Sequence, residues 1–308
     1  MMVSGFDMVT GAGGYTGKYI AARLLERGRS VMNLTGHSER TSVFGARVPA
    51  FPLCFDRPRA LADALAGADT LYNTYWVRFA HGRVDFDQAV AHTAVLIRAA
   101  EQAGVRRLVH ISITSASTAS PLPYFRGKGR VEELIAASRL SYAILRPTVV
   151  FGREDILINN VAWLLRRLPF FVIPGAGDYR LQPVFVGDLA DMAVACSQRS
   201  DNLIMDAVGP EVFTFERLVR LIAATVRRRA AIVHAPPRLA LGVARVIGWA
   251  VGDVMLTSDE VAGLMADLLI SHQPPTGTTR LRTWLKEHAA DIGQSYASEL
   301  RRHFRDAR

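Results

Sequence analysis

Two residues that could move a proton stand four positions apart, Tyr124 and Lys128. This spacing places both side chains on one face of a helix. A free tyrosine has a pKa of about 10, and a cationic lysine nearby favours the phenolate and lowers that pKa toward neutral pH. The pair is therefore a candidate for acid–base chemistry.

A glycine-rich turn forms a second candidate, the stretch VTGAGGYTGKYI at residues 9–20. Gly11 permits a tight turn, Gly14 lets the backbone approach a pyrophosphate, and Gly17 lets the following helix pack closely on the strand. The helix N-terminus adds unpaired N–H groups and the positive end of its dipole. The stretch predicts a dinucleotide-binding loop, whose expected members are Gly11, Gly13, Gly14, Tyr15, Thr16 and Gly17.

These residues need a scaffold, and strands and helices alternate through the first half of the chain. Strands are expected at 6–9, 30–35, 70–74, 107–113 and 142–150, with a weaker one at 48–55. Helices are expected at 16–27, 58–66, 85–103 and 124–138, punctuated by glycine after the helix end and proline near the start. This alternation predicts an α/β fold with a Rossmann-like, doubly wound parallel sheet.

After about Arg153 the pattern becomes mostly helical, with helices expected at 156–168, 214–226, 239–251, 258–270 and 295–304. Thr257 and Glu260 form a capping box for the fourth of these. One strand–helix unit, 181–199, is expected to return to the main sheet. We therefore predict a dinucleotide-binding domain at 1–152 together with 181–199. A smaller, mostly helical substrate-binding lobe would comprise 153–180 and 200–308.

Composition excludes several classes of partner. Half of the 308 residues are apolar and the formal net charge is +9, carried almost wholly by arginine. The short arginine runs lack the interleaved aromatic residues of a nucleic-acid platform, so we expect no nucleic-acid partner.

Cys54 and Cys196 are expected to be buried, reduced thiols. The histidines show no metal spacing, so no metal site is expected. The start has no basic signal-peptide region, which predicts a cytoplasmic protein.

The Gly-x-x-Gly-x-x-Gly spacing resembles the short-chain dehydrogenase/reductase superfamily, in its extended or atypical branch. Tyr124-x-x-x-Lys128, LRPTVVFG at 145–152 and RLQPVFVGDLADMAV at 180–194 agree with it. Residues 149–180 are similar to the subgroup related to the nucleotide-binding accessory subunit of respiratory complex I. The resemblance implies that Tyr124 is the general acid/base and that Lys128 also holds the nicotinamide ribose. It also places Pro147, Thr148 and Val149 at the nicotinamide.

The residues after the second strand bear on the choice of cofactor. No carboxylate ends that strand to hold the ribose of NAD. His37, Ser38 and Arg40 could instead meet the 2′-phosphate of NADP(H), with Arg40 offering a bidentate fork. NADP(H) is favoured, and Glu39 keeps NAD(H) possible. Further cofactor contacts are expected from Asp56, Arg57, Thr74 and Tyr75, although Asp56 could merely cap a helix.

The hydroxyl that would steady the substrate carbonyl is ambiguous. Ser112 lies 12 residues before Tyr124, near the usual family spacing, but Ile113 could occupy that position. Thr114 and Ser115 are the other candidates. Tyr75 and Trp76 are bulkier than the usual family residues, and we expect them to narrow the pocket or lie over the nicotinamide ring.

Three functions remain open. The first is an NAD(P)-dependent oxidoreductase acting on a carbonyl or alcohol of a small, apolar substrate. The second is a non-catalytic, cofactor-binding accessory or regulatory protein, and the third is a sugar-nucleotide epimerase or dehydratase. The intact Tyr124–Lys128 pair favours the first, since a protein that only binds the cofactor needs no acid/base.

The segment 239–255 is apolar around most of its circumference, with Arg245 and Asp253 as its only charges. Core packing, together with the apolar run 170–173, is the favoured explanation. The alternatives are the wall of an apolar pocket or a face resting on a membrane surface. We expect no stable membrane insertion and no binding to anionic vesicles.

Overall fold

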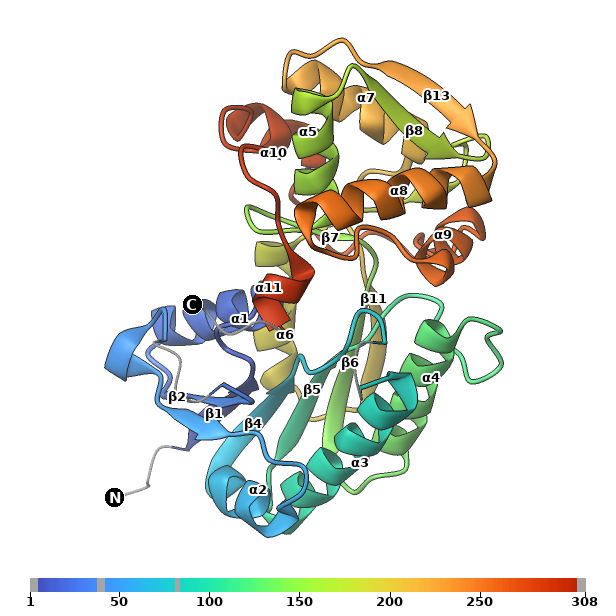
Figure 1. The fold of residues 1–308 in the computed structure, drawn as a ribbon. Coiled ribbons are helices and arrows are strands. Elements are labelled where there is room, and N and C mark those ends of the chain that lie inside the picture. The colour runs from blue at the N-terminus through green and yellow to red at the C-terminus, as the bar shows by residue number, and fades with distance from the viewer. Residues whose placement is uncertain (1–4, 38–41, 81–83, 304–308) are drawn as a thin grey trace. The chain divides into compact units, whose positions relative to one another are not determined.

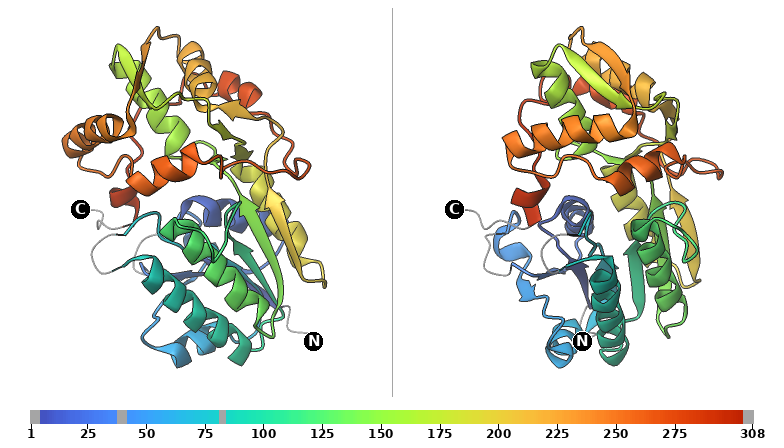
Figure 2. Two further views of the ribbon diagram at one scale, coloured as in Figure 1. Left: turned by 90° about the vertical axis from the view of Figure 1, so that its right-hand side faces the viewer. Right: turned by 45° about the vertical axis from the view of Figure 1, so that its right-hand side comes forward.

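The computed structural model describes residues 5–37, 42–80 and 84–303, and it divides into two compact units (Figures 1 and 2). The first unit comprises Met1–Pro147 and Val186–Ala207. The second comprises Thr148–Phe185 and Val208–Arg308. Each unit has its own hydrophobic core and is described separately.

A seven-stranded sheet in the order β11-β6-β5-β4-β1-β2-β3 forms the centre of the first unit. All neighbouring strands are parallel. The strands are β1 (Phe6–Thr10), β2 (Val31–Thr35), β3 (Ala50–Pro52), β4 (Ala68–Asn73), β5 (Arg107–Ile111), β6 (Ser141–Pro147) and β11 (Leu203–Ala207). Residues on both faces of these strands are buried, as is typical of parallel strands that are covered on both faces.

Five helices cover the sheet: α1 (Tyr15–Glu26), α2 (Pro58–Leu65), α3 (Phe86–Gln102), α4 (Pro123–Ala136) and α6 (Val186–Ser197). Helices α1 and α6 pack together, and α2, α3 and α4 form a second group (Figure 1). The second group buries Leu61, Leu65, Leu96 and Ile135 in one core with the strands. The predicted doubly wound, Rossmann-like sheet is confirmed.

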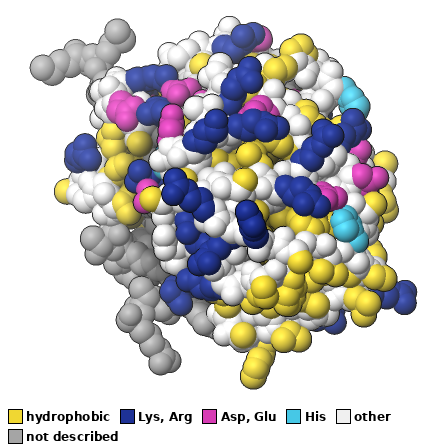
Figure 3. Space-filling model, turned by 90° about the horizontal axis from the view of Figure 1, so that it is seen from above, with side chains coloured by type: hydrophobic (Ala, Val, Ile, Leu, Met, Phe, Trp, Pro, Cys, Tyr) yellow, Lys and Arg dark blue, Asp and Glu magenta, His cyan; other side chains and the backbone are white. Residues whose placement is uncertain are grey.

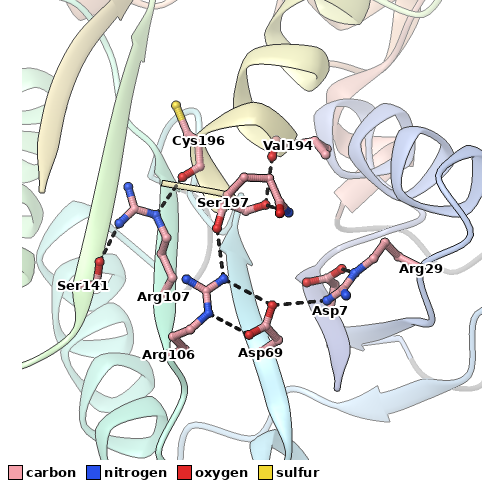
Figure 4. A network of polar contacts seen from close by, with 10 residues as sticks. Asp7, Arg29, Asp69, Arg106, Arg107, Ser141, Val194, Cys196 and Ser197 are labelled. Carbon is pink, nitrogen blue, oxygen red and sulfur yellow. Dashed lines mark hydrogen bonds and ion pairs between the residues drawn. The ribbon is translucent and has the colours of Figure 1, made fainter. Parts of the chain in front are cut away.

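An ion-pair network joins the amino ends of the strands (Figure 4). Arg29 Nε donates to Asp7 Oδ2 at 2.7 Å, and Arg29 Nη2 reaches Asp69 at 3.2 Å. Arg106 Nε donates to the other oxygen of Asp69 at 2.7 Å and Arg106 Nη2 donates to the Ser197 carbonyl. Burial raises the pKa of Asp7, and Arg29 opposes that shift. The network therefore satisfies charges that the sheet buries.

Neighbouring Arg107 is also satisfied at this edge. Its side chain is fully buried and donates to the Cys196 carbonyl at 2.7 Å and to Ser141 Oγ (Figure 4). It also donates to the Asp201 carbonyl. These bonds tie α6 and the chain after it to β5 and β6.

The second unit has six helices in its described part: α5 (Leu157–Arg167), α7 (Phe215–Thr225), α8 (Pro237–Val251), α9 (Ser258–Met265), α10 (Leu281–Glu287) and α11 (Glu299–His303). Its strands pair in twos: β7 (Val150–Phe151) with β10 (Val184–Phe185), β9 (Arg180–Leu181) with β12 (Phe213–Thr214), and β8 (Phe170–Pro174) with β13 (Ala231–Ala235). A core of aromatic and aliphatic side chains holds these elements, including Phe151, Phe213, Phe215 and Trp284. The Thr257–Glu260 capping box is present at α9.

Several expected elements differ. The unit 181–199 contributes α6 to the first unit, but its strand β10 pairs with β7 and not with the main sheet. The seventh strand of that sheet is β11, at 203–207. The apolar run 170–173 lies in a strand, β8. Helix α9 ends at Met265, because Asp267 adopts a left-handed φ of 55°.

Two further differences concern the ends of the chain and its thiols. Helix α10 has no counterpart among the expected helices, and the helix expected at 295–304 covers only 299–303, with Phe304 outside the described residues. Cys196 is buried as expected, whereas Cys54 is half-buried, and both are free. Across the described ranges, no helix is both long and apolar enough to cross a bilayer.

Candidate functional site

The glycine loop lies at the carboxyl end of β1, and its geometry requires glycine at two positions. Gly11 has a left-handed φ of 67°. A Cβ on Gly17 would lie 2.2 Å from the Gly11 carbonyl oxygen, so only glycine lets α1 approach the loop this closely. A Cβ on Gly13 would meet no other atom within 4 Å, so the backbone at Gly13 is open to a ligand.

The amino end of α1 fits an anionic group. The helix begins at Tyr15 after Gly14, which provides no side-chain cap, and its first turn contains no acidic residue. Backbone N–H groups at such an end attract phosphate oxygens. Asn33, which no sequence motif reveals, accepts a hydrogen bond from the Ala12 N–H at 2.8 Å and fixes the loop from β2.

The carboxyl end of β4 is tied to that of β1. Thr74 Oγ1 donates to the Thr10 carbonyl at 2.6 Å, while Thr10 Oγ1 accepts the N–H groups of Thr74 and Tyr75 at 2.7 and 3.1 Å. Two predicted cofactor residues, Thr74 and Tyr75, are therefore held beside the glycine loop. The backbone and the Thr74 hydroxyl make this link.

Lys128 lies on α4 and is almost completely buried, with 3% of its surface exposed. Its Nζ donates to the Ile111 carbonyl at the end of β5, at 2.8 Å, and lies 4.5 Å from the centre of the Trp76 ring. Burial lowers the pKa of Lys128 to about 7. The structure thus places a lysine that titrates near neutral pH at the same sheet edge as the glycine loop.

Tyr124 precedes Lys128 by one turn of α4 and is half-buried. Its ring packs edge-on against Trp76 and Phe86, with ring centres 6.0 and 5.7 Å apart. Trp76 also packs against α4 at Gly127, where a Cβ would lie 3.0 Å from the indole ring. Trp76 therefore contacts both Tyr124 and Lys128. That it narrows a substrate pocket stays a prediction.

Tyr75 turns toward α3. Its hydroxyl lies 2.7 Å from His92 Nδ1, whose ring stacks on Phe55 with centres 4.1 Å apart. Burial raises the pKa of Tyr75 to about 12 and lowers the pKa of His92. Tyr75 is therefore a neutral hydrogen-bonding group at neutral pH.

Ser112, one of the candidates for the hydroxyl that steadies the substrate oxygen, is engaged by a residue of α4. Its Oγ donates to Glu132 Oε1 at 2.5 Å. Glu132 lies one turn after Lys128 on α4 and also accepts Arg146 Nε and Nη2. Ser112 and Glu132 are both buried. The proton of this serine is thus committed to a buried carboxylate.

Thr114 and Ser115 follow at the end of β5. Thr114 is buried, and its N–H donates to the Pro147 carbonyl at 2.9 Å. Ser115 has a left-handed φ of 57°, which is unusual for a residue other than glycine. The chain therefore turns sharply at this point.

The residues expected near the adenosine are only partly described. His37 is half-buried and its N–H donates to Thr35 Oγ1, whereas Ser38, Glu39 and Arg40 lie outside the described residues. Asp56 is exposed and does not cap α2, since the N-cap position belongs to Arg57. Arg57 is exposed and donates to Cys54 Sγ at 3.0 Å.

The residues after β6 divide between the two units. Pro147 ends β6 in the first unit, whereas Thr148 and Val149 belong to the second. The Thr148 hydroxyl donates to the Gln182 carbonyl, and the Val149 carbonyl accepts the Val184 N–H at 2.9 Å. The hydroxyl of Thr148 is therefore used inside its own unit.

His110, fully buried on β5, is not among the site residues expected from the sequence. Its Nδ1 lies 3.1 Å from Asn73 Nδ2, so it accepts that hydrogen bond. Burial and the nearby charge of Lys128 lower the pKa of His110 well below its ordinary value. Asn73 Oδ1 in turn accepts Thr10 Oγ1 and the Tyr75 N–H. This network of neutral groups positions the ends of the strands. The only feature of the sequence that points to His110 is that it is a polar residue within a mostly apolar strand.

Within the described ranges, no three His, Cys, Asp or Glu side chains come together as metal ligands would. The groups gathered at the carboxyl edge of the sheet are amides, hydroxyls, a neutral histidine, one lysine and the Glu132–Arg146 ion pair. Such groups suit a phosphate- and ribose-containing ligand.

Comparisons with known proteins agree with this geometry. Residues 11–155 match a family model described as NAD(P)H-binding. The chain is similar to the mitochondrial NADH dehydrogenase [ubiquinone] 1 alpha subcomplex subunit 9 of Arabidopsis thaliana. The two are 26% identical over 284 residues, which is 85% of this chain and 70% of that subunit.

Two solved structures share the fold. One is an NADPH-dependent quinone oxidoreductase from Escherichia coli complexed with NADPH, with a TM-score of 0.74, 19% identity and coverage of 92% of this chain and 99% of that one. The other is a nucleoside-diphosphate-sugar epimerase from Staphylococcus aureus, with a TM-score of 0.67, 17% identity and coverage of 96% and 99%. The resemblance to the complex I subunit is confirmed, and the fold is that of NAD(P)-binding reductases and epimerases.

Proposed function

We propose that this chain is an NAD(P)H-dependent oxidoreductase that reduces a carbonyl, or oxidises an alcohol, of a small apolar substrate. The single observation that carries the proposal is the buried Lys128 at the carboxyl edge of the sheet, with Tyr124 one turn before it on α4. Lys128 has no carboxylate within ion-pair distance among the described residues, and the charge of Glu132 compensates its burial only in part. A buried lysine of this kind destabilises a protein, and such groups concentrate at functional sites. Structural packing alone gives no reason to retain it.

The residues present fit a dinucleotide. The open backbone at Gly13 and the uncapped start of α1 would face the pyrophosphate, and Lys128 would donate to the nicotinamide ribose. When bound, the nicotinamide supplies or accepts hydride. In the reductive direction Tyr124 donates its phenolic proton to the substrate oxygen, and the positive charge of Lys128 stabilises the phenolate that remains.

NADP(H) is the cofactor we favour, because His37, Ser38 and Arg40 follow β2 where an acidic residue would select NAD(H). Glu39 leaves NAD(H) as the alternative. For the hydroxyl that steadies the substrate oxygen we favour Thr114, since the Ser112 proton is donated to Glu132. Substrate binding is assigned to 153–180 and 200–308, and a cytoplasmic location remains part of the proposal.

One observation favours a second candidate, a non-catalytic NAD(P)H-binding accessory protein. The Ser112 hydroxyl, near the family's usual position, is held by the buried Glu132–Arg146 pair. The similarity to a complex I subunit supports the same alternative. Both candidates share cofactor binding and differ in turnover.

The two candidates separate in one experiment with the full chain. Binding of NADPH and NADH is first measured by fluorescence titration, and turnover is then measured with NADPH and a panel of apolar aldehydes, ketones and quinones. Tyr124→Phe should retain cofactor binding and lose a factor of about 10² to 10⁴ in rate. Full activity of this variant would contradict the role of Tyr124. Cofactor binding without turnover on any member of the panel would favour the accessory protein.

A further inference from the structure

Helix α8 (Pro237–Val251) packs with its small residues inward. Ala240, Ala244 and Gly248 are its buried positions. The large apolar residues on its other face are exposed, with Val246 69% and Trp249 88% accessible. The expectation that this segment forms ordinary core is therefore wrong for its outer face.

Close packing explains the orientation. A Cβ on Gly248 would lie 2.6 Å from the Asp253 carbonyl oxygen, so no larger residue fits the inner face at that point. Small residues line the buried face of the helix and large residues line the exposed face, and both faces are mostly apolar. Soluble monomers rarely expose such contiguous apolar surface unless it binds something.

The exposed face continues into an open apolar groove beside the start of β8. Leu168 and Phe170 form one side, and the α8 residues Leu239, Gly242, Val243, Val246 and Ile247 form the other, with Arg238 at its end. Phe170 is itself exposed, unlike its neighbours Phe171 and Ile173. The groove is wide enough to receive apolar groups from outside.

Helix α8 and the segment before it carry side-chain charge of a single sign. Residues 217–252 contain seven arginines and no aspartate or glutamate. Arg238 and Arg245 lie seven residues apart, on one side of the apolar stripe, and both are exposed. In the described part of the chain, neither forms a hydrogen bond or an ion pair. Figure 3 shows hydrophobic side chains gathered on one part of the surface, with Lys and Arg side chains and a smaller number of Asp and Glu side chains near them.

Contrary to the expectation from sequence that the chain does not bind anionic vesicles, we propose that the outer face of α8 docks this unit on an anionic phospholipid surface, without spanning it. Val246 and Trp249 would enter the headgroup region, and Arg238 and Arg245 would meet lipid phosphates. As in interfacial amphipathic helices, apolar area and basic charge would act together, although here the opposite face of the helix packs on the protein. The inference does not depend on the proposed catalytic activity.

Charge is what favours lipid over a protein partner. A protein interface buries its arginines against specific acceptors, whereas a leaflet of anionic lipid supplies acceptors at every position along the helix. Tryptophan at the rim of an apolar face is also the residue that membrane interfaces favour. Both features lie on one exposed helix face here.

The test is flotation of the full chain with vesicles of phosphatidylcholine alone and with about 30% phosphatidylglycerol added, at low and at physiological salt. Binding is expected only to the anionic vesicles, weakening as salt rises. Brominated lipid should quench tryptophan fluorescence in the wild type and much less in Trp249→Phe. Arg238→Gln/Arg245→Gln should weaken binding about 30-fold. Trp249→Ser should weaken it at least about tenfold.

Two matched controls keep the inference testable. Arg59→Gln/Arg98→Gln removes two exposed arginines of the first unit, and Val212→Ser removes an exposed apolar residue of the second. Neither should change vesicle binding more than about twofold. Equal losses in the control and α8 arginine variants would show non-specific charge attraction and overturn the inference. Absence of vesicle binding would overturn it as well and leave a protein partner as the occupant of this face.

Discussion

The two edges of the parallel sheet treat buried charge in opposite ways. At the amino edge, the Asp7 side chain is 2% exposed and Arg29 pairs with it at 2.7 Å. At the carboxyl edge Lys128 is buried to a similar degree, yet its Nζ has a carbonyl and an aromatic ring as partners. Among the described residues, no carboxylate lies within ion-pair distance of Lys128.

This difference separates charges that serve the fold from a charge that serves a ligand. A buried ion pair is broken at high cost when one partner is removed, because the other charge is left without compensation. A buried single charge already bears that cost, and the protein becomes more stable when the charge is removed. The charges of the amino edge are satisfied within the chain, and under the proposed function a bound cofactor completes the carboxyl edge.

The largest effect is expected from breaking the amino-edge pair. Arg29→Met leaves the Asp7 carboxylate buried and should lower the free energy of unfolding by about 3–5 kcal/mol at pH 7. Denaturation with urea measures this change. Asp7→Asn/Arg29→Met, which removes both charges, should recover most of the loss. An unchanged midpoint in the single variant would contradict the assignment of this pair to the fold.

The opposite sign is expected at Lys128. Its pKa in the folded protein is about 7, against an ordinary value of 10.5, so between these values the unfolded chain holds a proton that the folded chain lacks. The unfolding free energy of the wild type therefore rises with pH across that window, and the destabilisation is complete below pH 7.

Lys128→Met should accordingly stabilise the cofactor-free protein by about 2–4 kcal/mol at pH 6, after allowance for the lost hydrogen bond. The gain should shrink toward pH 10, and cofactor affinity should fall. Urea denaturation at pH 6, 8 and 10 tests the stability change, and fluorescence titration with NADPH tests the affinity. A variant that is less stable than the wild type at pH 6 would show that Lys128 serves the fold.

The sequence predicted most of the first unit because its signals are local. Buried parallel strands are continuous apolar runs, and the glycine loop and the Tyr124–Lys128 pair depend only on spacing along the chain. The β8–β13 pair joins segments about 60 residues apart, and no local pattern reveals such a pairing. The commitment of Ser112 to Glu132 likewise depends on how α4 packs on β5.

Helix α8 shows a different limit. Its residues are apolar on nearly every side, so periodicity alone does not indicate which side faces the core. The decisive residue is Gly248, whose close contact with the Asp253 carbonyl selects the small-residue face for burial. Thr74 and Tyr75, in contrast, lie beside the loop as expected, because parallel strands bring their carboxyl ends to one edge.

A smaller effect tests which cofactor, NADP(H) or NAD(H), binds at the carboxyl edge of the sheet. If the 2′-phosphate of NADP(H) meets Arg40, Arg40→Ala should weaken NADPH binding by about 1.5–3 kcal/mol and leave NADH binding unchanged. Arg59→Ala, an exposed arginine of α2, is the matched control and should change neither. Fluorescence titration with both cofactors gives the answer, and an equal loss for the two would rule out the phosphate contact.

The smallest effect is expected at Ser112. This residue lies at the carboxyl edge of the sheet, but its polar group is satisfied by partners within the chain, as the charges of the amino edge are. Its hydroxyl donates to Glu132, and Arg146 keeps that carboxylate paired after the hydroxyl is removed. Ser112→Ala should therefore lower the free energy of unfolding by only about 1.5 kcal/mol, the low end for a hydrogen bond to a charged group. Turnover should fall less than about fivefold, in contrast to the 10²-fold or greater loss expected for Tyr124→Phe. If Ser112→Ala instead abolishes turnover while stability is preserved, then the hydroxyl leaves Glu132 during the reaction and Ser112, not Thr114, steadies the substrate oxygen.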